Sequence, residues 1–425
     1  MADSRTLVDS PIGVSSDCLF NLKSTCAPSR SLRTNLPSIN GSTFLGGSSS
    51  IFYVPAGRRG TFLDGNNNTY LKFTVVNNDN TVGNAMFIDN SAYSFINRID
   101  IGQSSNSQLE TIQQANVLQN YLLDFGCIPS AKQGLSSCYG TTSGITLAQA
   151  STNDARQGNV IYGGANSQKL TFCIPLIGSA IFSSCDSLFP LCILNDDLKI
   201  EITWELNNLA CCYAALPAGN WSIVNPELVV NIIEIGEQGM EIINNATPLS
   251  NTIYIHGSSW KHYTANLPGL SQGQFSFPIS ARFSSLKSLV ILPRRNTETT
   301  NGLAYSIGSR INPNISQFFL RCGSYMIPSK PITLQNAVSC GGYGEAYSEL
   351  LKSFHSLSTP QYSAGMPFQY YCIADAVDNS VGGGINGVLG GVTVGSTLGN
   401  SFKNGFALAV ELEVFLIEIV QFYQD

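Results

Sequence analysis

Charged residues are scarce in this sequence. Only 12% of its 425 residues are Asp, Glu, Lys or Arg, whereas a typical soluble protein has about 25%. Asn, Ser, Gly and Thr supply most of the polarity, and 43% of the residues are hydrophobic. This composition favours a chain whose surface is largely covered by other chains. The alternative is an uncharged, Asn- and Ser-rich surface of the extracellular or viral kind.

A basic surface for nucleic acid is also missing. The net charge is −6, whereas contact with a phosphate backbone needs clustered Lys and Arg. The only basic doublets are Arg58-Arg59 and Arg294-Arg295, which we interpret as solvated turns or subunit contacts. We therefore expect no direct sequence-specific binding of nucleic acid.

Targeting and membrane signals are absent as well. The first ten residues, MADSRTLVDS, contain neither the basic region nor the apolar region of a secretory signal. No apolar run approaches the roughly 18 residues that a membrane-spanning helix requires. We expect a chain that is made without a signal peptide and has no membrane span.

The twelve cysteines form no metal-binding pattern. No CxxC spacing occurs and no His lies in register with a Cys pair, so the common zinc sites are excluded. Cys173 and Cys322 lie inside apolar runs, which predicts small buried hydrophobic residues. The pattern favours a reducing compartment at synthesis and leaves disulfides open.

Histidine, the commonest general base, occurs only three times. His256 and His262 are six positions apart with no carboxylate nearby, which is a poor arrangement for a metal. We place His355 on the solvent side of a helix. The GxSxG, HExxH and P-loop motifs are also absent.

Two acidic pairs could be imagined as catalytic. They are Asp196-Asp197 and the pair Glu411 and Glu413. The second pair lies on one predicted strand with both side chains on the same face, so we interpret it as a wet face or subunit contact. The sequence therefore predicts no catalytic, cofactor-binding or metal-binding residue, and no enzyme.

The sequence does contain many short β patterns. Residues 198–206 alternate almost strictly between apolar and polar, as is typical of a strand with one buried face. Residues 126–165 and 381–400 are rich in Gly and small polar residues, which predicts long loops. We predict a short helix at 237–244 and strands at 51–55, 61–63, 70–76, 95–99, 170–174, 188–194, 198–206, 226–235, 253–255, 275–278, 286–291, 318–322, 368–373 and 406–415.

A strand–loop–helix unit occurs twice, at 94–125 and at 316–357. In the first copy, Ser107 and Glu110 form a capping-box pattern that predicts the start of an amphipathic helix. The second copy predicts a helix with an apolar face over 343–357. Repetition on this scale indicates a duplicated domain.

Other features repeat in the same order as these units. Both halves contain an aromatic-x-x-Pro strand end, a Leu-Lys strand, a strand with one Arg, a helix and an alternating strand, at a near-constant offset of about 220 residues. The repeat markers are Pro55, Lys72 and Arg98 in the first half and Pro278, Lys287 and Arg321 in the second.

The predicted fold class is all-β, with two tandem jelly-roll sandwiches that each carry one accessory helix. We assign 1–45 to an N-terminal arm, 46–245 to the first jelly roll and 246–425 to the second. Because 406–415 resembles 198–206, we expect the second jelly roll to lack its closing strands and to be truncated.

The final LIEIVQFYQD breaks the alternation of the preceding strand. One codon-compatible sequence for these residues encodes a polar turn in a shifted frame. This motivates the hypothesis that the last ten residues arise from a frameshift. The coding DNA tests it, and a downstream frame without further β pattern would contradict it.

Five stretches carry a resemblance to a known family: TYLKFTVVN (69–77), AYSFINRIDIG with its helix (92–125), RFSSLKSLVI (282–291), FLRCGSYMIPSKPI with its helix (319–357) and FALAVELEVF (406–415). Through them the chain resembles the double jelly-roll major capsid proteins of tailless icosahedral DNA viruses, in particular the polinton-like virus and virophage branch.

This resemblance implies a structural role in a virion. Two upright jelly rolls stand side by side in each subunit, and a homotrimer forms a pseudo-hexagonal capsomer of the capsid. The implied partners are neighbouring capsomers, a single jelly-roll vertex protein, a packaging ATPase and often a maturation protease. No cofactor is implied.

Two other functions fit a β-sandwich. A receptor-binding or glycan-binding spike protein would contain a compact ligand pocket. A glycoside-processing jelly roll would need paired carboxylates that converge in a cleft, and the sequence shows no convincing pair. The main hypothesis is a major capsid protein without enzymatic activity, and its trimeric state distinguishes it from a spike.

Overall fold

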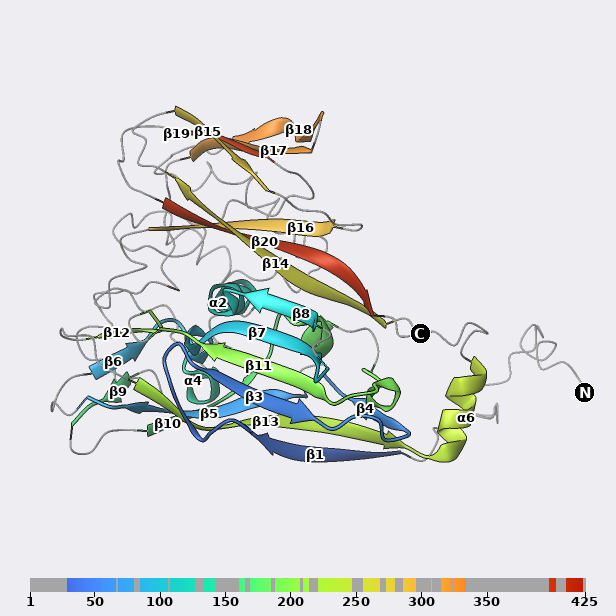
Figure 1. Cartoon of the computed structure of the whole chain (residues 1–425). Coiled ribbons are helices and arrows are strands. Elements are labelled where there is room, and N and C mark those ends of the chain that lie inside the picture. The colour runs from blue at the N-terminus through green and yellow to red at the C-terminus, as the bar shows by residue number, and fades with distance from the viewer. Residues whose placement is uncertain are drawn as a thin grey trace, which may run out of the picture.

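Strands make up most of the structure, a computed structural model of the chain (Figure 1). They form two sandwiches, one above the other in Figure 1, and the lower one is the N-terminal half. The structure describes residues 29–65, 68–79, 85–105, 108–126, 134–141, 160–164, 169–184, 188–206, 209–213, 221–246, 255–267, 273–279, 286–295, 307, 315–322, 324–333, 397–402 and 410–422.

Two antiparallel sheets build the first sandwich. One has the order β1-β13-β5-β10, with β2 and β4 also paired to β13, and the other has the order β3-β11-β7-β8. Neighbours in these sheets come from distant parts of the chain, as in a jelly roll. The strands are β1 (Ser29–Pro37), β2 (Thr43–Leu45), β3 (Ser49–Val54), β4 (Thr61–Leu63), β5 (Tyr70–Asn77), β7 (Ile96–Gln103), β8 (Gln108–Gln113), β10 (Lys169–Pro175), β11 (Leu198–Trp204) and β13 (Trp221–Ile235).

Strand β11 shows why these residues form a sheet with one buried face. Its residues alternate between buried and half-buried along its whole length. Ile200 lies opposite Phe52 of β3 and Ile101 of β7, so apolar residues of three strands meet on the inner face. The strand predicted from the alternation at 198–206 is confirmed.

Aromatic rings fill the space between the two sheets. The ring of Phe73 in β5 lies 5.2 Å from Trp204 of β11 and 5.9 Å from Phe172 of β10. Phe95 contacts both Phe73, at 6.2 Å, and Trp221, at 5.0 Å. Because all five side chains are buried, this cluster holds the first sandwich together.

Short elements surround this sandwich. A third sheet has the order β12-β6-β9, and part of it comes from the segment predicted as a loop at 126–165. The helix predicted at 237–244 is confirmed as α6. These elements are β6 (Ala85–Ile88), β9 (Val160–Tyr162), β12 (Cys211–Tyr213), α2 (Ala115–Gly126), α4 (Ser136–Tyr139), α6 (Glu237–Ala246), the 3-10 helices η2 (Ala92–Phe95) and η4 (Leu191–Ile193), and the π-helix η3 (Ala180–Ser184).

The second sandwich repeats the topology of the first. Its sheets have the orders β14-β20-β16 and β15-β19-β17-β18. Strands β14, β20 and β16 take the places of β1, β13 and β5, and the other four take those of β3, β11, β7 and β8. The predicted pair of tandem jelly rolls is confirmed. The strands are β14 (Ile255–Leu267), β15 (Gly273–Pro278), β16 (Leu286–Arg295), β17 (Ile315–Cys322), β18 (Tyr325–Thr333), β19 (Thr397–Phe402) and β20 (Val410–Phe422).

The six repeat markers lie on or directly after strands that have corresponding places in the two halves. Pro55 follows β3 and Pro278 ends β15; Lys72 lies in β5 and Lys287 in β16; Arg98 lies in β7 and Arg321 in β17.

The matching of 406–415 to 198–206 is wrong. Strand β20 pairs with both β14 and β16, as β13 pairs with β1 and β5, so β20 corresponds to the last strand of the first jelly roll. The counterpart of β11 is β19. The strand expected to be missing therefore has a counterpart, and pairing continues through residues 416–422 without the predicted interruption.

The capping box assigned to Ser107 and Glu110 is also wrong. Residues 108–113 form β8, which pairs with β7, and the helix begins only at Ala115. This segment forms a strand and not the start of a helix, and there the Glu110 side chain accepts hydrogen bonds from Ser179 and Ser259 inside the protein.

The loop predicted after residue 322 contains a strand, β18, which pairs with β17. The helix predicted at 343–357 and the strand at 368–373 lie outside the described residues.

Four further assignments change. Residues 188–194 make a single bridge, between Phe189 and Leu63, followed by η4, because Pro190 has no N–H for a sheet. Residues 29–45 of the predicted arm contain β1 and β2, which pair with β13. Cys173 is half-exposed, since Phe172 and Ile174 take the inner face of β10. The loop predicted at 381–400 overlaps the start of β19.

The aromatic cluster gives a first prediction. Replacement of Phe73 by Ala should lower the free energy of unfolding by about 3–5 kcal/mol, because it removes a buried ring from three aromatic contacts. Thr74→Ala, on the outer face of the same strand, is the control and should cost about 1 kcal/mol. Urea unfolding followed by tryptophan fluorescence measures both, and equal losses would contradict the prediction.

Candidate functional site

The candidate functional site is the junction between the two jelly rolls. Strand β8 and the π-helix η3 of the first jelly roll contact β14 of the second, and α2 lies beside them in Figure 1. Ile255, Trp260, Val290, Leu292 and Ile307 of the second jelly roll belong to the same buried cluster as the core of the first. The two halves therefore share one continuous apolar core.

A buried carboxylate lies at the centre of the junction. Glu110 of β8 is 2% exposed. Its Oε2 accepts a hydrogen bond from Ser179 Oγ at 2.7 Å, and Oε1 accepts one from the backbone N–H of Ala180 at 2.8 Å. Oε1 also accepts one from Ser259 Oγ of β14 at 2.8 Å. One side chain thus joins three elements across both jelly rolls.

None of these donors to Glu110 carries a charge. Burial raises the pKa of the Glu110 carboxyl, and the hydrogen bonds from Ala180, Ser179 and Ser259 oppose that rise. An uncompensated charge in an apolar interior is costly, so this position favours the protonated carboxyl more than water does.

A second buried carboxylate crosses the junction at another point. Asp89 follows β6 in the first jelly roll and is buried. Its Oδ2 accepts a hydrogen bond from the backbone N–H of Ile307 in the second jelly roll, at 2.6 Å. Hydrogen bonds thus connect the two jelly rolls, with carboxylates of the first jelly roll as acceptors and uncharged groups of the second jelly roll as donors.

Two glycines allow the backbones to approach at this junction. A Cβ on Gly257 of β14 would lie 3.2 Å from the Cβ of Ala180, closer than side chains normally pack. Gly178 has a φ of +86°, which glycine adopts without strain. A Cβ there would contact Leu118 of α2 at 3.4 Å and Trp260 at 3.8 Å. A larger residue at position 257 would crowd Ala180 across the junction, and one at position 178 would strain the backbone.

Helix α2 is fixed at its first turn by a third buried carboxylate. Oε2 of Glu205 accepts hydrogen bonds from Asn97 Nδ2 and Asn116 Nδ2, both at 2.6 Å. Asn116 is the second residue of α2, where a negative charge interacts favourably with the helix dipole. Glu205 therefore positions the helix against β7 and the junction.

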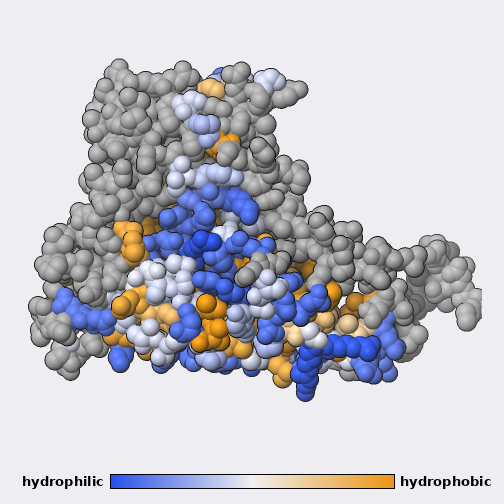
Figure 2. Space-filling view, in the orientation of Figure 1, coloured by the Kyte–Doolittle hydropathy of each residue, from blue (hydrophilic) through white to orange (hydrophobic). Residues whose placement is uncertain are grey.

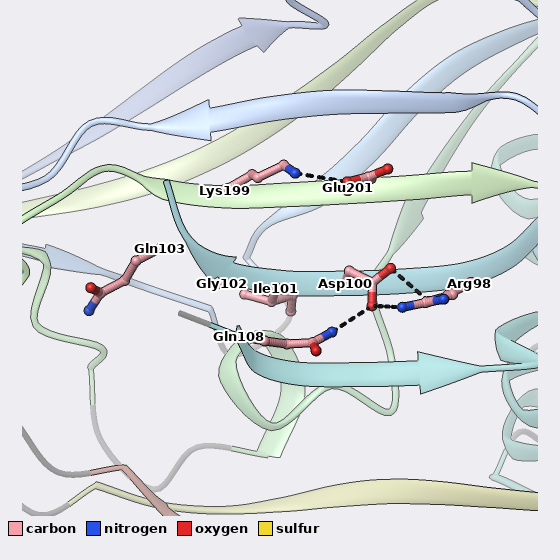
Figure 3. Close-up of a pocket in the computed structure, with 8 residues that line it drawn as sticks. All are labelled: Arg98, Asp100, Ile101, Gly102, Gln103, Gln108, Lys199 and Glu201. Atoms are coloured by element: carbon pink, nitrogen blue, oxygen red, sulfur yellow. Dashed lines mark hydrogen bonds and ion pairs between the residues drawn. The ribbon is translucent and has the colours of Figure 1, made fainter. Parts of the chain in front are cut away.

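The outer face of the β3-β11-β7-β8 sheet carries a shallow polar hollow of about 240 Å³ (Figure 3). Asp100 accepts hydrogen bonds from Arg98 Nη2 at 2.9 Å, Gln108 Nε2 at 3.0 Å and Thr111 Oγ1 at 2.8 Å. In Figure 3 Arg98 and Gln108 both point toward Asp100 from neighbouring strands. The hydrogen bonds satisfy the carboxylate within the sheet.

A second acid in this hollow is paired in the same way. Glu201 lies opposite Asp100 in the sheet register, but its Oε2 is 2.9 Å from Lys199 Nζ. The hydrogen bond to Glu201 raises the pKa of Lys199. A glycoside hydrolase needs one carboxyl that stays protonated and one free carboxylate. These two acids are each neutralised by a cation, so their arrangement does not suit that chemistry.

The visible face of the molecule is mixed in character (Figure 2). Hydrophilic surface covers its middle, and small apolar patches lie along the first jelly roll below it. Among the described residues, no group of three or more His, Cys, Asp or Glu side chains could hold a metal ion. In the same residues no helix has the length and apolar character to cross a membrane.

The other residues considered as sites are distributed over the strands. His256 and His262 both lie in β14, and Glu411 and Glu413 lie in β20. Asp197 accepts a hydrogen bond from the backbone N–H of Ala56 at 3.0 Å, which fixes the turn after β3. His355 lies outside the described residues.

The junction carboxylates belong to no recognisable sequence motif. The local pattern at Glu110 predicts a helix cap, and the sequence around Asp89 and Glu205 predicts no special role for them. The one available signal was an acid inside an alternating apolar run, as at Leu109-Glu110-Thr111-Ile112. Such an acid on the buried face of a strand needs partners from outside its own sheet.

Comparison with known proteins finds no matching family model and no matching curated sequence. Among solved structures, the chain is similar to a PBCV-1 virus capsid chain with a TM-score of 0.57 and 10% identity, over 95% of this chain and 97% of that one. The Faustovirus major capsid protein has a TM-score of 0.57 and 9% identity, over 96% and 92%. The mavirus major capsid protein has a TM-score of 0.52 and 10% identity, over 97% and 93%.

These similarities cover both jelly rolls and not just one. At such low identity they show a shared fold, the double jelly roll, and the resemblance inferred from the sequence is confirmed at that level.

The junction gives a second prediction, which concerns pH. Because the folded pKa of Glu110 is raised above its usual 4.5, the folded chain holds this proton more tightly than the unfolded chain. The resulting stabilisation is complete below the unfolded pKa and is lost as pH rises through the folded pKa. Glu110→Gln cannot titrate, so the stability of the wild type relative to this variant should fall as pH rises from about 4.5 to 8.

Urea unfolding midpoints of both chains across this range measure the difference. A constant difference would contradict the assignment of the titration to Glu110.

Ser259→Ala should lower the free energy of unfolding by about 1–3 kcal/mol, because it leaves a buried carboxyl with one donor fewer. Thr264→Ala, at an exposed position in the same strand, is the matched control and should have little effect.

Proposed function

We propose that this chain is a structural major capsid protein of an icosahedral DNA virus and has no enzymatic activity. The observation that carries the proposal is the pair of jelly rolls with the same strand order, joined through one shared core. Each of the three compared chains comes from a viral capsid or is a major capsid protein.

The geometry supports assembly as a trimer. A subunit with two similar lobes presents six lobes when three copies surround a threefold axis, and six lobes give a nearly hexagonal outline that can tile a shell. This works only if the two lobes keep a fixed relation within each subunit. The buried junction, with its shared apolar cluster and two carboxylates, supplies that rigidity.

The composition is consistent with large interfaces. Only 12% of the residues are charged, and the core of a permanent interface is depleted in charged residues. The further proposed partners of the protein are neighbouring capsomers and a single jelly-roll vertex protein, and its proposed location is the virion.

We retain the division into an arm, a first jelly roll to residue 245 and a second from 246, and add β1 and β2 to the first jelly roll.

A spike protein that binds a receptor or glycan is the rival function. It would need a compact pocket with unpaired polar groups. The hollow in Figure 3 is shallow, and its acids and bases pair with one another. No observation favours the spike over the capsid protein.

The third prediction tests the assembly. Light scattering coupled to size exclusion should give the purified chain a mass three times the 45.6 kDa of one chain. The trimer should persist on dilution to low micromolar concentration, as expected for a large permanent interface. A well-folded monomer at all concentrations would contradict the capsid proposal, and glycan and ligand screens would then test the spike.

A further inference from the structure

Two cysteines lie on neighbouring surface elements of the first jelly roll. Cys138 is exposed on α4, and Cys173 is half-exposed on the outer face of β10. Both are free thiols. In the chain, α4 lies between α2 and the strands β9 and β10. A bond between the two thiols would attach α4 to the sheet that contains β10.

Aromatic contacts hold α4 against the end of β10. The ring of Tyr139 lies 6.1 Å from that of Tyr93, and Tyr93 Oη donates a hydrogen bond to the carbonyl of Pro175 at 2.8 Å. Helix α4 contacts β10, and Cys173 lies two residues before Pro175 in that strand. Because Cys138 directly precedes Tyr139, these contacts bring its backbone close to Cys173.

The electrostatic surroundings of Cys173 agree with this placement. Burial raises the pKa of its thiol, and the next largest contribution in the same direction comes from Cys138. Lys72 and Arg33 act in the opposite direction. Cys138 is therefore one of the few ionisable groups near enough to act on Cys173.

We propose that Cys138 and Cys173 are a site of reversible disulfide formation with a small-molecule disulfide such as glutathione disulfide. The exposed Cys138 thiolate attacks one sulfur of glutathione disulfide, which forms a mixed disulfide and releases one glutathione thiolate. Cys173, as its thiolate, then attacks the Cys138 sulfur of the mixed disulfide and releases the second glutathione. Two protein thiols are oxidised, and glutathione disulfide is reduced to two glutathione molecules.

The physiological setting of this step rests on the proposed function. A capsid protein is made in a reducing cell, where both thiols stay free, and it meets oxidising conditions when the particle leaves that cell. The bond would then close a loop between α4 and β10 and reduce the freedom of the unfolded chain. The particle would become more resistant to unfolding only after release.

The fourth prediction tests the bond in the full chain. The purified protein is equilibrated with glutathione disulfide, the remaining thiols are alkylated, and protease digests are mapped by mass spectrometry without reduction. The expected product is a linked peptide pair that contains Cys138 and Cys173 and is lost on reduction. The oxidised chain should also melt several degrees higher than the reduced chain.

Matched variants decide whether the bond causes this shift. Cys138→Ser and Cys173→Ser should each abolish the linked pair and the rise in melting temperature. Cys192→Ser, which changes another half-buried free thiol, should retain both. Recovery of Cys138 or Cys173 as alkylated thiols, as single glutathione adducts, or linked to other cysteines would overturn the proposal. The mapping does not depend on the oligomeric state, so its failure is distinguishable from failure of the capsid proposal.

Discussion

The structure depends on two buried carboxylates that accept hydrogen bonds across the junction of the jelly rolls. Glu110 and Asp89 both accept hydrogen bonds from uncharged donors of the second jelly roll. Burial of an acid costs free energy, which its hydrogen bonds offset only while they keep a short length and a nearly straight angle. Such bonds therefore constrain the positions of the donors relative to the acid. An apolar contact alone would tolerate sliding of one lobe over the other. The two carboxylates therefore fix the register of the lobes.

The two jelly rolls share a strand order, and they contact each other at an edge of the first. There β8 is the edge strand of its sheet and contacts β14 of the second jelly roll. Its counterpart β18 is the edge of the corresponding sheet in the second. An unprotected edge invites pairing with another chain. The duplication therefore protects one edge within the subunit through contact between the copies.

Much of the fold was predictable from alternation and repetition. The β11 strand, with Leu198, Ile200 and Ile202 inside, followed directly from its period of two, and the order of Pro55, Lys72 and Arg98 relative to the second half indicated the duplication. Strand β8 was missed because a helix cap and an acid-containing strand share the same local pattern. Only the partners Ser179 and Ser259, distant in the sequence, distinguish them.

The junction could not be predicted for the same reason. Sequence periodicity reports which face of a strand is buried, but not which other segment covers it. Cys173 illustrates this limit, since its apolar neighbours suggested a core position while the pleat placed it on the outer face. The equivalence of β20 with β13 is evident only from the strands with which each one pairs. The alternation at 406–415 resembles that of β11 equally well, so the sequence alone favours the wrong match.

Many of the few charged side chains in the described part of the chain pair with one another. Five ion pairs among the described residues join neighbouring groups of the first sandwich: Arg30 and Arg58 with Glu234, Lys72 with Glu227, Arg98 with Asp100, and Lys199 with Glu201. Each of these four carboxylates has a cationic partner within the subunit. Under the proposed capsid function, identical copies face one another in a shell, and unpaired charge of one sign on them would repel. Cohesion between such subunits must then come from apolar burial, shape and uncharged hydrogen bonds, which salt screens weakly.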